Sequence, residues 1–323
     1  MSSSEPRRLI KFGNSSFVIS LPISWIKENN LDKGDLVYLE RNGDNELIIV
    51  PTKSGTSAVE KETEITISVD GKDQETLRRE MTSAYINGYG SIILKGKTIK
   101  SKLSQIKNTT DFLIGVSILH QSGGEMLIKD VLSHERLPPQ ELVSRINTTI
   151  AAMFTHLQNA LKSKEFVKEY NEIKSFDIEI NRNYLLVWKL MKKYSHNSNG
   201  MNGNGSNLNS TDLYNSWWLA MNQEYIGDEI KRIARALTKI KFSVTEYQKI
   251  SQIVDASKKV YSDTIHSLSQ KDRELALDLA RRPLAKECQK ILEGNCNLAL
   301  ESLCDRFLTI SRHIHYIIKI SIY

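Results

Sequence analysis

The spacing of apolar residues changes twice along this chain of 323 residues. Residues 1–54 carry short stretches in which apolar and polar positions alternate, as in strands that bury one face. Residues 62–133 mix such stretches with segments of helical spacing, and residues 138–323 show helical spacing almost throughout. The pattern predicts a multidomain protein with a small β region, a small α/β domain and an all-α bundle, in that order.

The first region contains a strand pattern and two turn signals. Phe17, Ile19 and Leu21 alternate along the chain, and Pro22 can open a short helix because its missing N–H would be unpaired there. Gly34-Asp35 and Asn42-Gly43 each mark a turn, the second of them typical of a β-hairpin. Because so short a segment with so few apolar side chains cannot close a core alone, it is expected to associate with a second copy of itself.

Several landmarks of this region occur in a characteristic order. They are Gly13, Ser15, Leu21-Pro22, Trp25-Ile26, Gly34-Asp35 and Asn42-Gly43. Over residues 6–52 this order resembles the AbrB/SpoVT/MazE swapped-hairpin family. The resemblance implies that residues 1–54 are half of a swapped-hairpin β-barrel, completed by the second chain of a homodimer, and that they bind DNA. Taken alone, the same residues also fit a small β element with no nucleic-acid role.

Basic side chains near the start of the chain are the candidates for DNA contacts. Arg7, Arg8 and Lys11 would be duplicated by dimer symmetry, and Lys27 on the short helix is a further candidate. The region holds as many acidic as basic residues. DNA binding would therefore depend on a local patch and not on net charge.

The second region predicts strands and helices in the order β-α-β-α-β-β. The expected segments are 65–69, 75–86, 91–94, 100–107, 112–119 and 126–128. The region has neither a Gly-x-Gly-x-x-Gly loop nor a Walker motif. It has a cluster of lysines, which fits either a solvated face or a ligand or nucleic-acid role: Lys95, Lys97, Lys100, Lys102 and Lys107.

The third region predicts six helices, at 139–163, 166–194, 211–240, 245–268, 271–292 and 296–321. They divide into two sets of three with matching order, which indicates duplication of a three-helix unit. Pro283 is expected to kink the fifth helix. Residues 195–210 are nearly all Asn, Gly and Ser and are expected to form a mobile loop.

The third of these helices carries the acidic pair Glu224 and Asp228 within the run Gln223 to Ala234. This run resembles the Glu-x-x-x-Asp motif of the PhoU family, in which each three-helix repeat carries such a motif and the carboxylates bind metal ions. A PhoU-like bundle behind an AbrB-like region resembles the archaeal phosphate uptake regulators that carry both modules.

The spacing of this pair permits two interpretations. Residues four apart share one helix face, and two carboxylates together suit Mg, Mn, Fe or Zn as a bound divalent or trivalent metal. Alternatively, Asp228 pairs with Arg232 on a solvated face. In the second repeat, Leu308 and Arg312 stand at the corresponding positions, so at most one metal site is expected.

Composition narrows the class of protein. The formal net charge is +6, which is compatible with an anionic partner. No apolar stretch is long enough to span a membrane, and no signal peptide is visible, so we expect a cytoplasmic protein without membrane insertion. Cys288, Cys296 and Cys304 lack metal-ligand spacing and are expected to be reduced. The absence of nucleophile, nucleotide-loop and zinc motifs argues against an enzyme.

Two functional hypotheses follow. The first is a homodimeric DNA-binding transcriptional regulator of phosphate uptake, with the PhoU-like part sensing a signal or docking a partner. The alternative is a signalling adaptor that docks on a phosphate transporter or sensor component, with the AbrB-like region used for dimerisation only.

Overall fold

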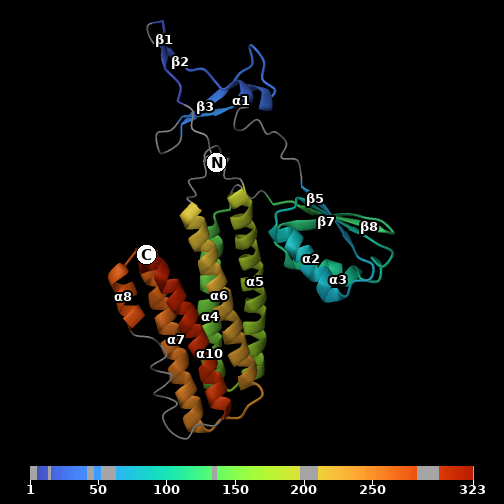
Figure 1. Cartoon of the computed structure of the whole chain (residues 1–323). Coiled ribbons are helices and arrows are strands. Elements are labelled where there is room, and N and C mark those ends of the chain that lie inside the picture. The colour runs from blue at the N-terminus through green and yellow to red at the C-terminus, as the bar shows by residue number, and fades with distance from the viewer. Residues whose placement is uncertain are drawn as a thin grey trace. The chain divides into compact units, whose positions relative to one another are not determined.

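The computed structural model describes residues 6–13, 16–41, 47–51, 63–132, 137–196, 210–281 and 298–322. These residues belong to two compact units (Figure 1). The first unit contains the described residues up to 51, which we call the head. The second contains the described residues from 63 onward and joins an α/β domain to a helical bundle.

The head contains two short hairpin pairings and one helix. Its elements are β1 (Ile10–Phe12), β2 (Ser16–Val18), α1 (Ile23–Glu28), β3 (Tyr38–Arg41) and β4 (Leu47–Val50). β1 pairs antiparallel with β2, and β3 pairs antiparallel with β4. The order predicted from the sequence is confirmed for the described residues, whereas the turn predicted at Asn42-Gly43 lies outside them.

Local chemistry explains the turns of the head. Gly13 and Gly34 have φ angles of +67° and +104°, which residues with a Cβ rarely adopt. The second turn is also held by the Asp35 carboxylate, which accepts a hydrogen bond from the Asp32 N–H at 2.7 Å. As expected, α1 begins directly after Pro22, which occupies the N-cap position.

The α/β domain follows the predicted order β-α-β-α-β-β. Its elements are β5 (Glu64–Ser68), α2 (Gln74–Ile86), β6 (Ser91–Lys95), α3 (Leu103–Phe112), β7 (Val116–Gln121) and β8 (Glu125–Asp130). The strands lie in the order β5-β6-β8-β7, with β5 parallel to β6 and the other pairs antiparallel. A separate core lies inside this domain, with Val69, Leu94, Ile99, Ile106 and Met126 fully buried.

One boundary in this domain differs from the prediction. The helix expected at 100–107 begins at Leu103 and continues to Phe112, so the strand expected at 112–119 begins only at Val116. The Asp70 carboxylate accepts hydrogen bonds from the backbone N–H groups of Lys97 and Thr98. These bonds hold Lys97 and Thr98 in a turn before α3. The hydroxyls of Thr109 and Thr110 bond to carbonyls one turn back, which satisfies these polar groups inside the helix.

The described part of the bundle contains long helices that run side by side (Figure 1). They are α4 (Pro139–Ser163), α5 (Phe166–His196), α6 (Ser210–Leu237), α7 (Val244–Gln270), α8 (Arg273–Arg281) and α10 (Leu298–Ile322). The predicted helices are present in the predicted order. Ser195 and His196 belong to α5 and not to the expected loop, most of which lies outside the described residues, as does Pro283.

The ends of α4 and α7 support the proposed duplication. Each helix ends at a lysine with positive φ, Lys164 at 63° and Lys271 at 54°. A left-handed residue at this position closes the last helical turn, and glycine is the usual choice. The first helix of each predicted three-helix unit thus ends in the same way.

The stripe Ile226, Ile230, Ile233 and Leu237 of α6 is buried in the bundle core, as its spacing predicted. Gly227 lies beside this stripe, where an added Cβ would stand 3.0 Å from the Cδ1 atom of Ile180 on α5. The absent side chain therefore lets α5 and α6 approach closely next to the acidic pair.

The α/β domain and the bundle share a polar junction inside the second unit. Lys189 of α5 is 1% exposed, and its ammonium lies 2.6 Å from the Asp130 carboxylate at the end of β8. The same ammonium lies 4.2 Å from the ring centroid of Tyr85 on α2. Because a buried charge is costly without such partners, these contacts fix the two parts together.

Within the part of the chain that the structure describes, no helix combines the length and apolar character needed to cross a membrane.

Candidate functional site

The four basic candidates of the head all carry exposed side chains. Arg7 and Arg8 lie shortly before β1, and Lys11 is the central residue of that strand, opposite Phe17 of β2. Lys27 lies on a different element, in the last turn of α1. The structure therefore places three of the candidates on one short stretch of chain, with Lys27 apart from them.

Apolar side chains of the head are left uncovered within one chain. No described residue of the head is buried. The exposed large apolar residues are Leu9, Ile10, Phe12, Phe17, Val18, Ile19, Ile23, Leu36, Val37, Leu39 and Leu47. Exposure of so many apolar side chains on one small unit is typical of a surface that another chain covers.

A second candidate site lies between α5 and α6. Lys231 of α6 donates hydrogen bonds of 2.7 Å to both Asp228 on its own helix and Asp177 on α5. Arg232 also contacts Asp228, at 3.4 Å, so the pairing expected in the alternative interpretation is present. Lys231 makes the closer contact and joins the two helices.

Glu224 differs from the other carboxylates of this cluster. Burial raises its pKa to about 7, and the negative charges of Asp228 and Asp177 add to this effect. Among the described residues, no hydrogen bond or ion pair reaches the Glu224 carboxylate. Glu224 is therefore a half-buried acid that gains and loses its proton near neutral pH.

Sequence reasoning found two members of this cluster and missed Asp177 and Lys231. Asp177 lies between Ile173 and Ile180, both fully buried, so it occupies the apolar stripe of α5. That position was the available signal, because a charged residue on such a stripe needs a partner. The partner on α6 could not be inferred from the spacing within α5.

The cluster provides carboxylate oxygens, which hard metal ions prefer. The Lys231 ammonium, however, bridges two of the three carboxylates, where a bound cation would otherwise do so. Within the described ranges, no group of three or more His, Cys, Asp or Glu side chains is arranged to hold a metal ion. A metal at Glu224 and Asp228 stays a prediction, and it would have to compete with this lysine.

The corresponding positions on α10 have a different chemistry. Leu308 packs against the core and Arg312 is exposed. His313 stacks on Tyr225 at a centroid distance of 4.7 Å and shares a 3.0 Å hydrogen bond with Asn222, whereas His315 is exposed. α10 thus contacts α6 here through an aromatic stack and an amide hydrogen bond, and not through carboxylates.

Comparison with known proteins bears on the head. Residues 10–57 match the model of a protein family described as "Antidote-toxin recognition MazE, bacterial antitoxin". The chain carries a MazE/AbrB-type domain at its N-terminal end. A domain of this type suggests DNA binding and is compatible with dimerisation. The comparison did not identify a PhoU domain in the helical region.

No curated protein and no solved structure matches the chain.

Proposed function

We propose that this protein is a homodimeric DNA-binding transcriptional regulator. The observation that carries the proposal is the MazE-type domain at residues 10–57, a domain type that suggests DNA binding. The uncovered apolar residues of the head support the dimer, because a second copy would bury them. Arg7, Arg8 and Lys11 would then be presented twice, as suits the two strands of a DNA duplex.

The finer proposal concerns what is regulated. The helical region would act as a PhoU-like sensing or docking part, and the genes controlled would be those of phosphate uptake. Support for this comes from the acidic motif at Glu224 and Asp228 and from the two sets of helices, both read from the sequence. The similar ends of α4 and α7 agree with a duplicated unit.

The direct test is retention of the gene's own upstream DNA by the purified full-length protein, with and without phosphate. Replacement of Arg7, Arg8 and Lys11 by Ala is expected to abolish retention while leaving the dimer folded. Each lost phosphate contact should also reduce the slope of log affinity against log salt by about one unit.

A matched control removes three exposed lysines from the bundle, Lys174, Lys259 and Lys319, by replacement with Ala. This variant loses the same formal charge and is expected to retain DNA. Equal retention by the two triple variants would contradict DNA binding through the head. A folded dimer without DNA retention that copurifies with a phosphate transporter or sensor component would favour the adaptor hypothesis.

A further inference from the structure

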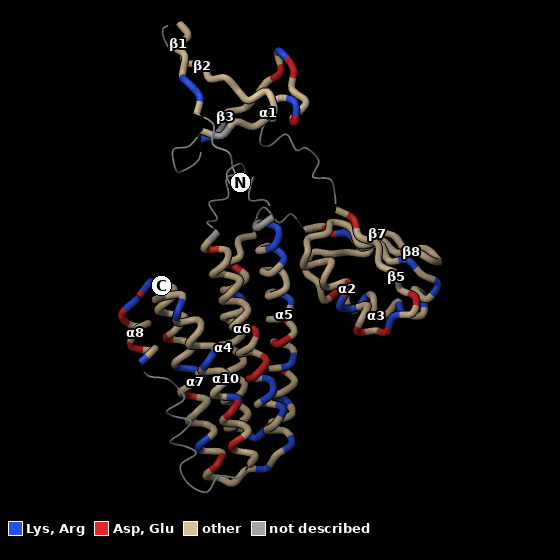
Figure 2. Tube along the Cα trace, viewed as in Figure 1, with Lys and Arg blue, Asp and Glu red and all other residues tan. Residues whose placement is uncertain are grey.

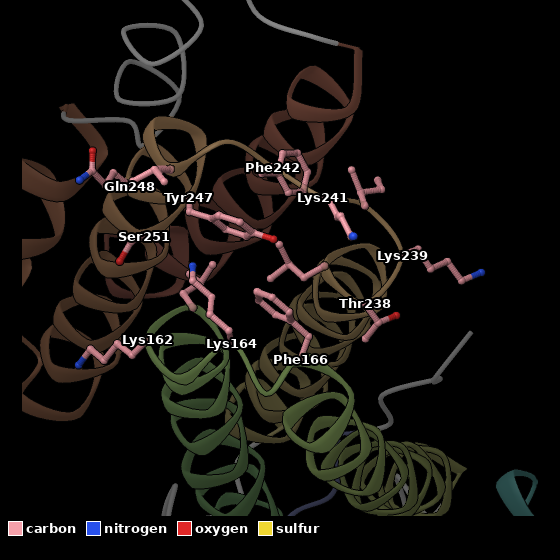
Figure 3. A pocket seen from close by; sticks show the side chains of 14 residues that line it. Lys162, Lys164, Phe166, Thr238, Lys239, Lys241, Phe242, Tyr247, Gln248 and Ser251 are labelled. Carbon is pink, nitrogen blue, oxygen red and sulfur yellow. The ribbon is translucent and has the colours of Figure 1, made fainter.

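A cavity of about 740 Å³ lies at the end of the bundle where α4 turns into α5 and α6 turns into α7 (Figure 3). Its volume falls within the range of small-molecule sites in proteins. All of its lining residues belong to the second unit, on segments 161–166 and 237–251. The cavity is remote in sequence from the head, and its second lining segment begins at Leu237, the last residue of the helix that carries the acidic pair.

Four lysines line this cavity, and no acidic residue does: Lys162, Lys164, Lys239 and Lys241. Among the described residues, no ion pair involves any of these four side chains. The neighbouring acids have other partners, since Glu165 pairs with Lys168 and Glu246 closes the cap of α7 at Ser243. The cavity therefore offers positive charge without an internal counterion.

Figure 3 shows that the four lysines fall into two pairs. Lys164 is turned toward Tyr247 and Lys241 lies beside Phe242 on the loop that borders the cavity, whereas Lys162 and Lys239 point away from the cavity. The Lys164 ammonium lies 3.6 Å from the centroid of the Tyr247 ring. Two cationic groups thus lie at the cavity.

Aromatic rings form a further part of the lining, next to Lys164. Phe166 and Tyr247 are stacked, with centroids 5.6 Å apart and ring planes 13° from parallel. Phe242 meets Tyr247 edge-on at 5.7 Å. Phe166 and Tyr247 are only half-buried, so ring surface remains available to a planar ligand.

We propose that this cavity binds a nucleoside phosphate. Its phosphate would contact Lys164 and Lys241, and its base would stack on the rings of Phe166 and Tyr247. Stacking of bases on aromatic side chains tolerates different bases, because every base has a flat π face. Lysine binds phosphate as a point charge and requires no glycine-rich loop. The proposal does not depend on DNA binding by the head.

The test is calorimetric titration of the full-length protein with AMP, GMP, CMP and UMP, and with inorganic phosphate and adenosine separately. At least one of the four nucleotides is expected to bind with a Kd below about 1 mM. Phosphate alone and adenosine alone are expected to bind at least about tenfold more weakly, because each engages only half of the lining.

The informative variant combines Lys164→Asn with Lys241→Gln. Asparagine is chosen because it tolerates the positive φ of residue 164. This variant is expected to lose affinity for the nucleotide at least about tenfold. The matched control, Lys162→Gln with Lys239→Gln, removes the same charge from the outward lysines and should change affinity less than about threefold.

A third variant, Tyr247→Leu, is expected to weaken nucleotide binding and leave phosphate binding unchanged. The circular dichroism of each variant must match that of the parent protein. Absence of binding by all four nucleotides would overturn the proposal. It would also be overturned by equal losses in the two lysine double variants, or by phosphate binding as tightly as the nucleotides.

Discussion

At the scale of single residues, the unusual group is the carboxyl of Glu224. It interacts electrostatically with the charges of Asp177, Asp228, Lys231 and Arg232. The positive charges of Lys231 and Arg232 do not offset the effect of burial on its pKa. Its pKa rises from 4.5 to about 7. The native protein therefore holds this proton over a pH range in which the unfolded chain has released it.

The consequence for stability has a definite sign. Between about pH 4.5 and 7 the native state binds more protons than the unfolded state, so the contribution of Glu224 to the free energy of unfolding falls as pH rises. Glu224→Gln removes this titration. We expect the variant to gain stability relative to the parent as pH rises, reaching about 1–3 kcal/mol above pH 7.

Urea unfolding of both proteins at several pH values from 4.5 to 8 measures this difference. A useful control is Glu229→Gln, because Glu229 is buried on the same helix and accepts hydrogen bonds from Arg232 and Arg306. That variant should lose stability at neutral pH. Parallel pH profiles for Glu224→Gln and its parent would refute the assignment.

Residue-level prediction from the sequence succeeded where a contact lies within one helix. The spacing of four residues predicted the contact between Asp228 and Arg232, which is present at 3.4 Å. The Asp177 contact could not be found in this way, because it joins two helices, and spacing within one helix does not show which residues of another helix face it. The proximity of Lys164 and Lys241 in the cavity at the end of the bundle was missed for the same reason, because they lie on separate segments of the chain.

At the scale of elements, periodicity predicted the long helices well. α4 has the predicted bounds, because its apolar stripe is continuous and a proline marks its start. The boundary between α3 and β7 was misplaced, because residues 112–116 carry no polar side chain. Such a run fits the end of a helix and the start of a strand equally well. The Asp70 carboxylate, distant in sequence, accepts hydrogen bonds from the N–H groups of Lys97 and Thr98 and holds the turn that precedes α3.

The two sets of helices also carry the metal prediction. A carboxylate pair exists on α6, whereas α10 has Leu308 and Arg312, so the bundle should bind at most one metal cluster. Elemental analysis of the purified protein beside a variant with Glu224→Ala and Asp228→Ala is expected to show less metal in the variant. Equal metal content in the two proteins would exclude this site.

Competition with the bridging ammonium gives an additional check. Lys231→Met keeps the length of the side chain and removes the charge that joins Asp177 to Asp228. If a metal binds there, its occupancy should rise in this variant, because the metal no longer displaces an ion pair. Arg235→Met, an exposed position near the end of α6, is the matched control and should leave metal content unchanged.

At the scale of the whole molecule, the head determines the expected oligomer. Burying one large apolar side chain contributes about 1.5–3 kcal/mol, and many such side chains of the head are uncovered in one chain. Deletion of residues 1–54 should therefore convert the dimer into a monomer or leave only a weaker contact through the bundle. Light scattering measures the mass.

Phe17→Glu in the full-length chain supplies a test that keeps every element present. Phe17 is 66% exposed within one chain, so the change should not disturb the isolated head. In a dimer it would bury a carboxylate and weaken the association. An unchanged dimer mass in both the deletion and the point variant would contradict dimerisation through the head.

The buried pair of Lys189 and Asp130 has a consequence for how this chain can be divided or inherited. A fragment that begins at the bundle would lose Asp130 and Tyr85, which contact the Lys189 ammonium, and would expose the face of α5 that they cover. A relative that replaces one partner would be under pressure to replace the other, because a lone buried charge is strongly destabilising. The α/β domain and the bundle therefore have separate folds, but they are expected to be inherited together and to require expression as one polypeptide.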